Sequence, residues 1–151
     1  MMTSTSCPLC AETGGVLVAQ GPRWRVIRAT EDANFPAFYR LVWTAHVAEF
    51  SDLDADGRRE CMEAVACIEQ ALREALAPTK VNLAALGNVV PHLHWHVIAR
   101  FDWDSHFPAP VWAAPRREVP GGAEARLALP LAALDARVAA AVSAFLQQRD
   151  A

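Results

Sequence analysis

The chain has 151 residues, of which 53% are hydrophobic, and a formal net charge of −3. A length of about 100–200 residues is typical of one domain, so we expect a single domain over residues 1–151. The slightly acidic balance offers no positive field to a nucleic-acid backbone and counts against a nucleic-acid-binding module. The chain starts without the basic residues and apolar run of a signal peptide and has no stretch of about 18 apolar residues, so we expect a cytoplasmic protein without membrane contact.

The first half of the chain predicts three strands and a long helix. Two short apolar runs, 15–20 and 24–30, flank a Gly-Pro turn and predict a hairpin. Residues 39–46 have the β-branched and aromatic content of a third strand, although Arg40 disturbs the alternation. Hydrophobic residues every three or four positions predict a helix within 51–78. The residues that set this spacing are Met62, Val65, Ile68, Leu72 and Leu76. Asp52 or Asp54 caps the start of the helix, and Pro78 ends it. Cys61 and Cys67 lie within the helix, and we expect them to be packing residues.

The second half predicts two more strands, a long loop and a last helix. Residues 80–87 and 92–101 have strand patterns and are joined by the tight connection NVVP. Residues 102–125 are rich in proline and read as an extended surface loop, and helical spacing resumes after Pro130. These elements predict an α+β fold in which helices cover a mostly antiparallel sheet.

Three of the five histidines occupy every second position of the last predicted strand: His92, His94 and His96. Side chains alternate along a strand, so all three point to one face while the apolar residues between them pack on the other. A row of imidazoles needs polar partners, so we expect this face to border a polar cleft.

Three interpretations of this histidine row are open. It is a set of structural residues, part of a metal site, or the centre of a phosphoryl or nucleotidyl transfer. A single zinc fits poorly, because the Cα atoms of His92 and His96 are about 13 Å apart in a strand while Zn–N bonds are about 2.0–2.1 Å. The turn before the row favours transfer chemistry, since glycine allows close backbone approach and exposed N–H groups bind phosphate.

The stretch NVVPHLHWHVIAR resembles the His-x-His-x-His-x-x signature of the histidine triad (HIT) superfamily of nucleotide hydrolases and transferases, where x is apolar. Upstream, VNLAALGN and RLVWTAHVAEFSDLD resemble the strands, phosphate loop and helix start of the same domain. The resemblance covers residues 7–112 and leaves the C-terminal loop and helix, 113–151, outside it. It implies a HIT-like fold with about five antiparallel strands and two main helices, and a homodimer.

The resemblance also implies roles for individual residues. His94 corresponds to the nucleophile that attacks the α-phosphorus to give a nucleotidyl-histidine, which water then hydrolyses. His96 corresponds to the histidine that binds phosphate oxygens and the leaving group. No metal is required. Phosphate contacts are implied at Asn82, Gly87, Asn88 and Val89.

Two positions depart from the family pattern. A fourth histidine found in many members aligns with Phe38, so one contact behind the triad is missing. The loop that carries the ribose-binding acid is shortened, and that acid is Asp32 or Glu31, of which we favour Asp32. Either residue can equally be a solvated loop charge.

Cys7 and Cys10 form a CxxC pair that is short enough to share one structural zinc. Some members of the resembled family complete such a site with two histidines, which by position are His46 and His92. The alternative is a pair of free thiols, because cysteines at these spacings do not indicate a secreted disulfide framework.

Four ring-bearing residues follow the histidine strand: Trp103, His106, Phe107 and Trp112. Three roles are open for them: to line a base pocket, to border the site of a dimer partner, or to anchor their own loop. We expect His106 at the surface.

The predicted substrate is a purine nucleoside 5′-phosphate bonded to an amine, a sulfate or a second phosphate, as in a phosphoramidate or a dinucleoside polyphosphate. The competing functions are a non-catalytic nucleotide-binding regulator and a metal-dependent hydrolase.

Overall fold

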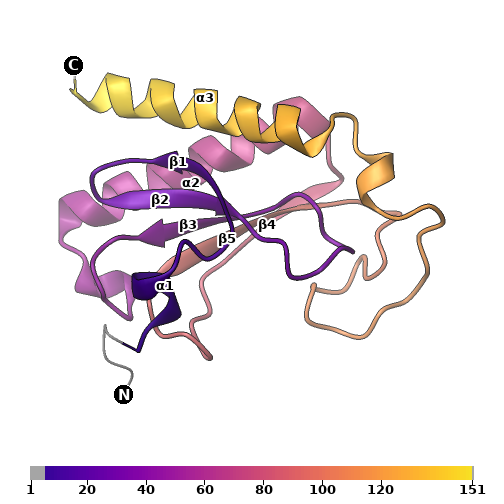
Figure 1. Cartoon of the computed structure of the whole chain (residues 1–151), viewed down its shortest axis with the longest axis horizontal. Coiled ribbons are helices and arrows are strands. Elements are labelled where there is room, and N and C mark those ends of the chain that lie inside the picture. The colour runs from indigo at the N-terminus through magenta and orange to yellow at the C-terminus, as the bar shows by residue number, and fades with distance from the viewer. Residues whose placement is uncertain (1–5, 151) are drawn as a thin grey trace.

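A computed structural model describes residues 6–150 and has a five-stranded antiparallel sheet at its centre (Figure 1). The order of the strands in the sheet is β1-β2-β3-β5-β4. Their bounds are β1 (Val16–Gln20), β2 (Trp24–Arg28), β3 (Phe38–Trp43), β4 (Lys80–Ala84) and β5 (His94–Arg100). The predicted α+β fold, with five antiparallel strands and two main helices, is confirmed.

Two long helices, α2 (Ala55–Leu76) and α3 (Leu131–Asp150), pack against each other and against the sheet. Figure 1 shows α2 behind the sheet and α3 beside β1, near the C-terminal end of the chain. The short helix α1 (Pro8–Ala11) lies on the opposite face, where Leu9 packs with Ile27 and Val42. Two 3₁₀ turns complete the structure: η1 (Phe50–Asp52) and η2 (Glu124–Arg126).

Local signals set the two ends of α2. Asp54 is the N-cap, and its Oδ1 accepts a hydrogen bond of 2.7 Å from the backbone N–H of Gly57. At the other end Ala77 adopts a left-handed conformation with φ 47°, and Pro78 prevents a further turn. The helix predicted within 51–78 therefore begins at the second of its two candidate caps. Its inner face is buried, including Val65, Ile68, Leu72 and Leu76.

The last strand begins two residues later than its alternation predicts. The prediction that this strand starts at His92 is wrong, because the chain makes a tight turn there. The His92 N–H donates to the carbonyl of Val90 at 2.8 Å, and the next N–H, of Leu93, donates to Val47 in the segment after β3 at 2.7 Å. His92 is therefore outside the ladder and can point away from the other two histidines.

The long loop after β5 is built on a buried ion pair. Nε of Arg100 lies 2.8 Å from Oδ2 of Asp104, and both side chains are almost fully buried. The prediction that His106 lies at the surface is wrong: it is 5% exposed, because its ring packs edge-on against Phe35 at 5.0 Å between centroids and its Nδ1 is 2.7 Å from Ser105 Oγ. Much of this proline-rich segment is thus anchored from within.

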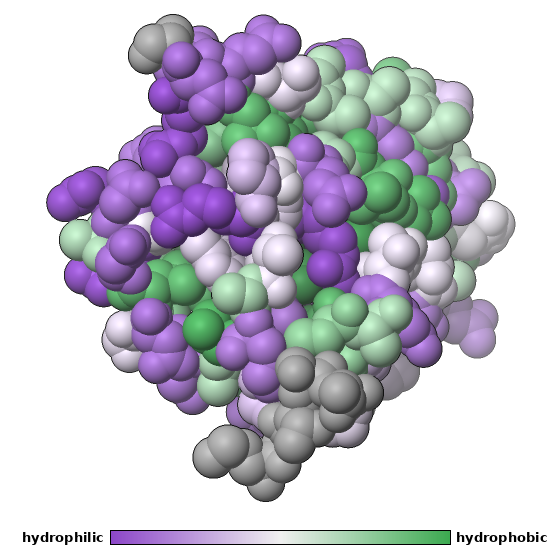
Figure 2. Space-filling view, turned by 60° about the vertical axis from the view of Figure 1, so that its left-hand side comes forward, coloured by the Kyte–Doolittle hydropathy of each residue, from purple (hydrophilic) through white to green (hydrophobic). Residues whose placement is uncertain are grey.

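The surface carries several hydrophobic patches among hydrophilic residues, as the face in Figure 2 shows. Large hydrophobic side chains that stay exposed are Val16, Leu17, Leu83, Leu86, Val89 and Trp112. Among residues 6–150, neither long helix nor any other has the length and apolar character needed to cross a membrane.

Candidate functional site

A pocket of about 740 Å³ lies on the face of the sheet that carries α1. Its walls come from the N-terminal segment, the polar residues of the sheet and the turn before β5, with Glu31 and Trp112 added from two other loops. The lining residues are Pro8, Leu9, Glu12, Gly14, Glu31, Arg40, Leu86, Gly87, Asn88, Val89, Val90, His94, His96 and Trp112. One wall is apolar and another is polar, which suits an amphiphilic ligand such as a nucleotide.

A hydrogen bond to the backbone sets the tautomer of His94. Its Nδ1 lies 2.6 Å from the backbone carbonyl of His92, and since a carbonyl only accepts, Nδ1 carries the hydrogen. The lone pair is then on Nε2. Burial lowers the pKa of His94, the bond to the His92 carbonyl opposes this, and the charge of Arg40 lowers it further. A neutral ring with an unprotonated Nε2 can attack an electrophilic phosphorus at neutral pH.

His96 lies beside it, with ring centroids 5.0 Å apart and planes at 86°. Its Nδ1 accepts a hydrogen bond of 3.2 Å from Nε of Arg40, so the neutral ring carries its hydrogen on Nε2. Burial, followed by the charges of His94 and Arg40, lowers the pKa of His96 to about 4. The neighbour of His94 is therefore an N–H donor without a positive charge.

Arg40 is a pocket residue that the sequence did not single out as functional, and Glu31, the less favoured of the two candidate ribose-binding acids, lines the same pocket. Arg40 lies opposite His96 in the β3–β5 ladder, and its Nη1 donates to Glu31 at 2.7 Å. Its guanidinium also lies over the ring of Phe38, 4.9 Å from the centroid. Phe38, which replaces the fourth histidine of the resembled family, touches His96 edge-on at 5.3 Å. The sequence signal that could have identified Arg40 was a charged residue in the middle of an otherwise apolar strand.

The turn before β5 lines the pocket, as its glycine indicated. Gly87 has φ +69°, a left-handed conformation that side chains rarely adopt. Asn88 and Val89 follow it along the pocket wall, and Val89 is 87% exposed. This places the turn beside the two histidines, where a phosphate would lie if His94 attacked it.

Two predicted nucleotide contacts lie elsewhere. Asn82 is on β4, where its Oδ1 accepts a hydrogen bond of 2.8 Å from Arg100, and it borders a separate hollow outside the main pocket. Asp32, favoured as the ribose-binding acid, caps its own loop by accepting from the N–H of Asn34 at 2.9 Å and does not line the pocket. The neighbouring Glu31 does line it.

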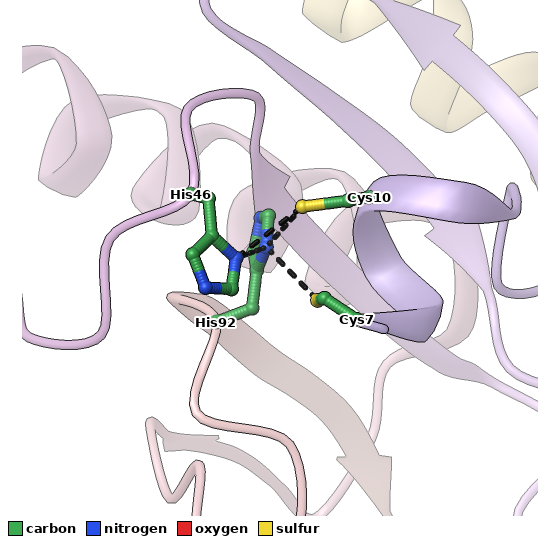
Figure 3. A group of neighbouring side chains, drawn as sticks. All are labelled: Cys7, Cys10, His46 and His92. Carbon is green, nitrogen blue, oxygen red and sulfur yellow. Dashed lines mark hydrogen bonds between the residues drawn. The ribbon is translucent and has the colours of Figure 1, made fainter. Parts of the chain in front are cut away.

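A second cluster brings together the four predicted metal ligands: Cys7, Cys10, His46 and His92 (Figure 3). Their ligand atoms all lie within 4.8 Å of one another. His92 Nδ1 is 3.4 Å from Cys7 Sγ, 3.5 Å from Cys10 Sγ and 3.2 Å from His46 Nδ1. Tetrahedral zinc with bonds of about 2.0–2.3 Å sets its ligand atoms about 3.3–3.8 Å apart, so the spacing fits.

The tautomer of His92 also fits a metal ligand. Its Nε2 lies 2.6 Å from the carbonyl of Trp43 and must donate to it, which leaves the lone pair of Nδ1 directed at the two sulfurs. Burial lowers the pKa of His92 and disfavours protonation of that atom. The two cysteines belong to α1 and its N-cap, and Arg25 holds the same segment by donating to the carbonyl of Leu9 at 2.9 Å. A metal here would fix one wall of the pocket.

The aromatic residues after β5 divide between two roles. Trp112 lines the pocket, and it is 60% exposed. Trp103 stacks on Phe101 with centroids 4.6 Å apart, and Arg126 lies over its ring. Of this group only Trp112 is in position to contact a ligand, while His106 and Phe107 anchor the loop around Asp104.

Comparisons with known proteins agree with this geometry. The HIT domain family matches residues 16–103. A histidine triad protein from Bradyrhizobium japonicum is 34% identical, with a TM-score of 0.62 over 71% of this chain and 81% of that chain. One from Sinorhizobium meliloti is 25% identical, with a TM-score of 0.68 over 90% of this chain and 97% of that one. A zinc-bound histidine triad family protein from Mycobacterium smegmatis is 15% identical, with a TM-score of 0.62 over 97% and 99%. No curated protein matches the chain.

Proposed function

This chain belongs to the HIT domain family of nucleotide-binding hydrolases and transferases, and from that membership we propose that it cleaves the α-phosphate linkage of a nucleoside 5′-phosphate derivative through a nucleotidyl-histidine. One observation carries the proposal. His94 lines the pocket with its Nδ1 hydrogen committed to the His92 carbonyl, so its Nε2 is the atom left to react.

The proposed reaction has two displacements at phosphorus. The Nε2 lone pair of His94 forms a bond to the α-phosphorus, and the leaving group departs with the electron pair of the bond that breaks and takes up a proton. His96 Nε2–H donates to the phosphoryl oxygens as charge develops there. Water then attacks the same phosphorus, loses a proton and displaces His94, which regains its lone pair. His94 attacks as a neutral imidazole, carries a positive charge while it is bonded to phosphorus, and leaves as a neutral imidazole. The lowered pKa of His94 favours the neutral form, and that of His96 keeps the neighbouring donor uncharged.

The lining of the pocket supports a nucleotide bound in one orientation. The phosphates would lie between the two histidines and the turn at Gly87 and Asn88, and the purine base against the apolar wall with Leu9. We assign the ribose hydroxyls to Glu31, because Asp32 faces its own loop. Asn82, which accepts a hydrogen bond from Arg100, lies on the same face of the sheet as His96 but outside this pocket, so we assign it no direct phosphate contact.

We also propose a structural zinc at Cys7, Cys10, His46 and His92. The donor set, its spacing and the His92 tautomer support it, and one structural neighbour is described as zinc-bound. None of the four ligands lines the pocket, so this zinc would stabilise the fold and take no part in the phosphorus chemistry. That location argues against a metal-dependent hydrolase.

Zinc is therefore expected to stabilise the folded chain. At a free zinc concentration 100 times its Kd, the free energy of unfolding should rise by about 2.7 kcal/mol. Thermal unfolding with and without a chelator, together with metal analysis, measures this. Cys10→Ser should lose both the metal and its effect, while Cys67→Ser, on α2 outside the cluster, should keep both. Equal metal content in wild type and Cys10→Ser would contradict the assignment.

We further propose a cytoplasmic homodimer that pairs at β4. This strand is at one edge of the sheet, and Leu83 on it is 43% exposed. Leu83→Arg is expected to shift the chain from dimer to monomer in sedimentation velocity measurements. Leu17→Arg, at a similarly exposed position (50%) on the opposite edge strand, should remain a dimer. A monomeric wild type, or a dimer that only Leu17→Arg disrupts, would contradict the interface.

A further inference from the structure

We infer that Arg40 is a positioning residue for the proposed reaction: it holds His96 in the tautomer that presents an N–H to the phosphate. The inference rests on the proposed function, because it assigns His96 a donor role toward the nucleotide. Arg40 itself comes from β3, outside the histidine strand and its turn.

Three contacts fix the guanidinium of Arg40 at the edge of the pocket. Its Nε donates to His96 Nδ1 at 3.2 Å, its Nη1 donates to Glu31 at 2.7 Å, and its plane lies over Phe38. The side chain is only 19% exposed, while the carboxylate that it pairs with is 60% exposed. The guanidinium of Arg40 is therefore held between the ring of Phe38 and the more exposed carboxylate of Glu31.

This arrangement leaves His96 one neutral tautomer. A guanidinium nitrogen only donates, so as long as Arg40 is in place Nδ1 must accept and the ring hydrogen must be on Nε2. Without that donor, both neutral tautomers become accessible, and one of them turns a lone pair toward the phosphoryl oxygens. Arg40 also adds a positive charge beside the ring, which opposes protonation of Nδ1.

A second arginine of the sheet provides a matched comparison. Arg28 on β2 donates through its Nε to Asp135 of α3 at 3.0 Å, and its side chain is 14% exposed. Like Arg40 it pairs with a carboxylate and is largely buried, but it contacts no histidine of the triad and does not line the pocket. A purely structural role for Arg40 predicts that loss of either arginine has the same kind of effect.

The test compares Arg40→Met with Arg28→Met. In wild type, ¹⁵N NMR should show His96 as the neutral Nε2–H tautomer at pH 7, whereas Arg40→Met should give a mixture of tautomers. For hydrolysis of adenosine phosphoramidate, Arg40→Met should lower kcat by about 10- to 100-fold with little change in KM, a loss typical of partners that orient a reacting group. Arg28→Met should lower thermal stability and leave kcat unchanged.

The pH profile gives an independent reading. His94, Arg40 and Glu31 are the charged or titratable groups around His96. Because the charge of Arg40 contributes to the lowered pKa of His96, its removal should raise that pKa and move the acid limb of kcat to higher pH. An unchanged tautomer together with an unchanged pH profile would overturn the inference. The NMR measurement needs no turnover, so a wild type that cleaves no nucleotide refutes the proposed function without deciding the role of Arg40.

Discussion

Replacing His94 by asparagine is expected to reduce the hydrolysis of adenosine phosphoramidate by at least about a thousandfold. The asparagine N–H group can keep the hydrogen bond to the His92 carbonyl, which measures 2.6 Å in the wild type, but asparagine has no nucleophilic nitrogen. The protein should thus fold and bind nucleotide normally and fail only in the chemical step. Steady-state rates without added divalent metal measure the loss.

A matched control separates this effect from the loss of any buried imidazole. His106→Asn removes a ring that is 5% exposed but lies outside the pocket, so its kcat should stay near that of wild type. Quenching with alkaline denaturant during turnover, which preserves the acid-labile P–N bond, should trap a nucleotidyl adduct in wild type and none in His94→Asn. A His94→Asn variant that retains a tenth of the wild-type rate would refute nucleophilic catalysis. Wild type that binds nucleotide tightly without product or adduct would instead identify a regulator.

Asp104→Ala is expected to lower the free energy of unfolding by about 3–5 kcal/mol, the cost of leaving a buried charge unpaired. The carboxylate of Asp104 accepts two hydrogen bonds from Arg100, at 2.8 and 3.1 Å. It also accepts from the backbone N–H groups of the loop, those of Phe101, His106 and Phe107. Removal of the carboxylate leaves the charge of Arg100, which is 2% exposed, without its ionic partner. It also removes the acceptor that holds the backbone of the segment after β5. Denaturant titration measures the change.

The expected pH dependence of this stabilisation has a definite sign. Burial raises the pKa of Asp104, but hydrogen bonds from Arg100 and from the backbone outweigh it, so the pKa lies below its usual range. The stabilisation should be complete above about pH 4, near the unfolded pKa, and be lost as the pH falls through the lower folded value. Asp102→Ala, at the exposed neighbour of this site, serves as control and should change stability little. A loss below about 1 kcal/mol for Asp104→Ala would mean that the loop is held by other contacts.

The fold was predictable because its signals are local. Apolar runs, β-branched and aromatic content and turn residues predicted the strands, the three-to-four spacing predicted α2 and α3, and Asp54 and Pro78 marked the ends of α2. The bounds of β5 were not predictable, since the tight turn at His92 depends on a hydrogen bond from Leu93 to Val47, a residue 46 positions earlier in the chain. The alternating pattern includes His92, so on its own it predicts that the strand starts before the turn ends.

The site was predictable where one segment contains it. The histidine row and its glycine turn lie within residues 87–96 and line one pocket, His92 excepted. Arg40 reaches the same pocket from another part of the chain, through the pairing of β3 with β5. In the sequence it looks the same as an ordinary surface charge, and the loop before β3 gave no ground for preferring Glu31 to Asp32. The buried state of His106 was likewise hidden, because it follows from packing against Phe35.

The alternation along β5 limits which length changes the gene can tolerate. His94 and His96 face the pocket, while Trp95 and Val97 pack in the core with α2. One inserted or deleted codon within the strand would exchange the two sets, turning imidazoles into the core and an indole into the pocket. Length variation among descendants of this sequence should therefore avoid β5 and collect at exposed positions of the loop after it, such as Gly121-Gly122, where a side chain would meet nothing within 4 Å.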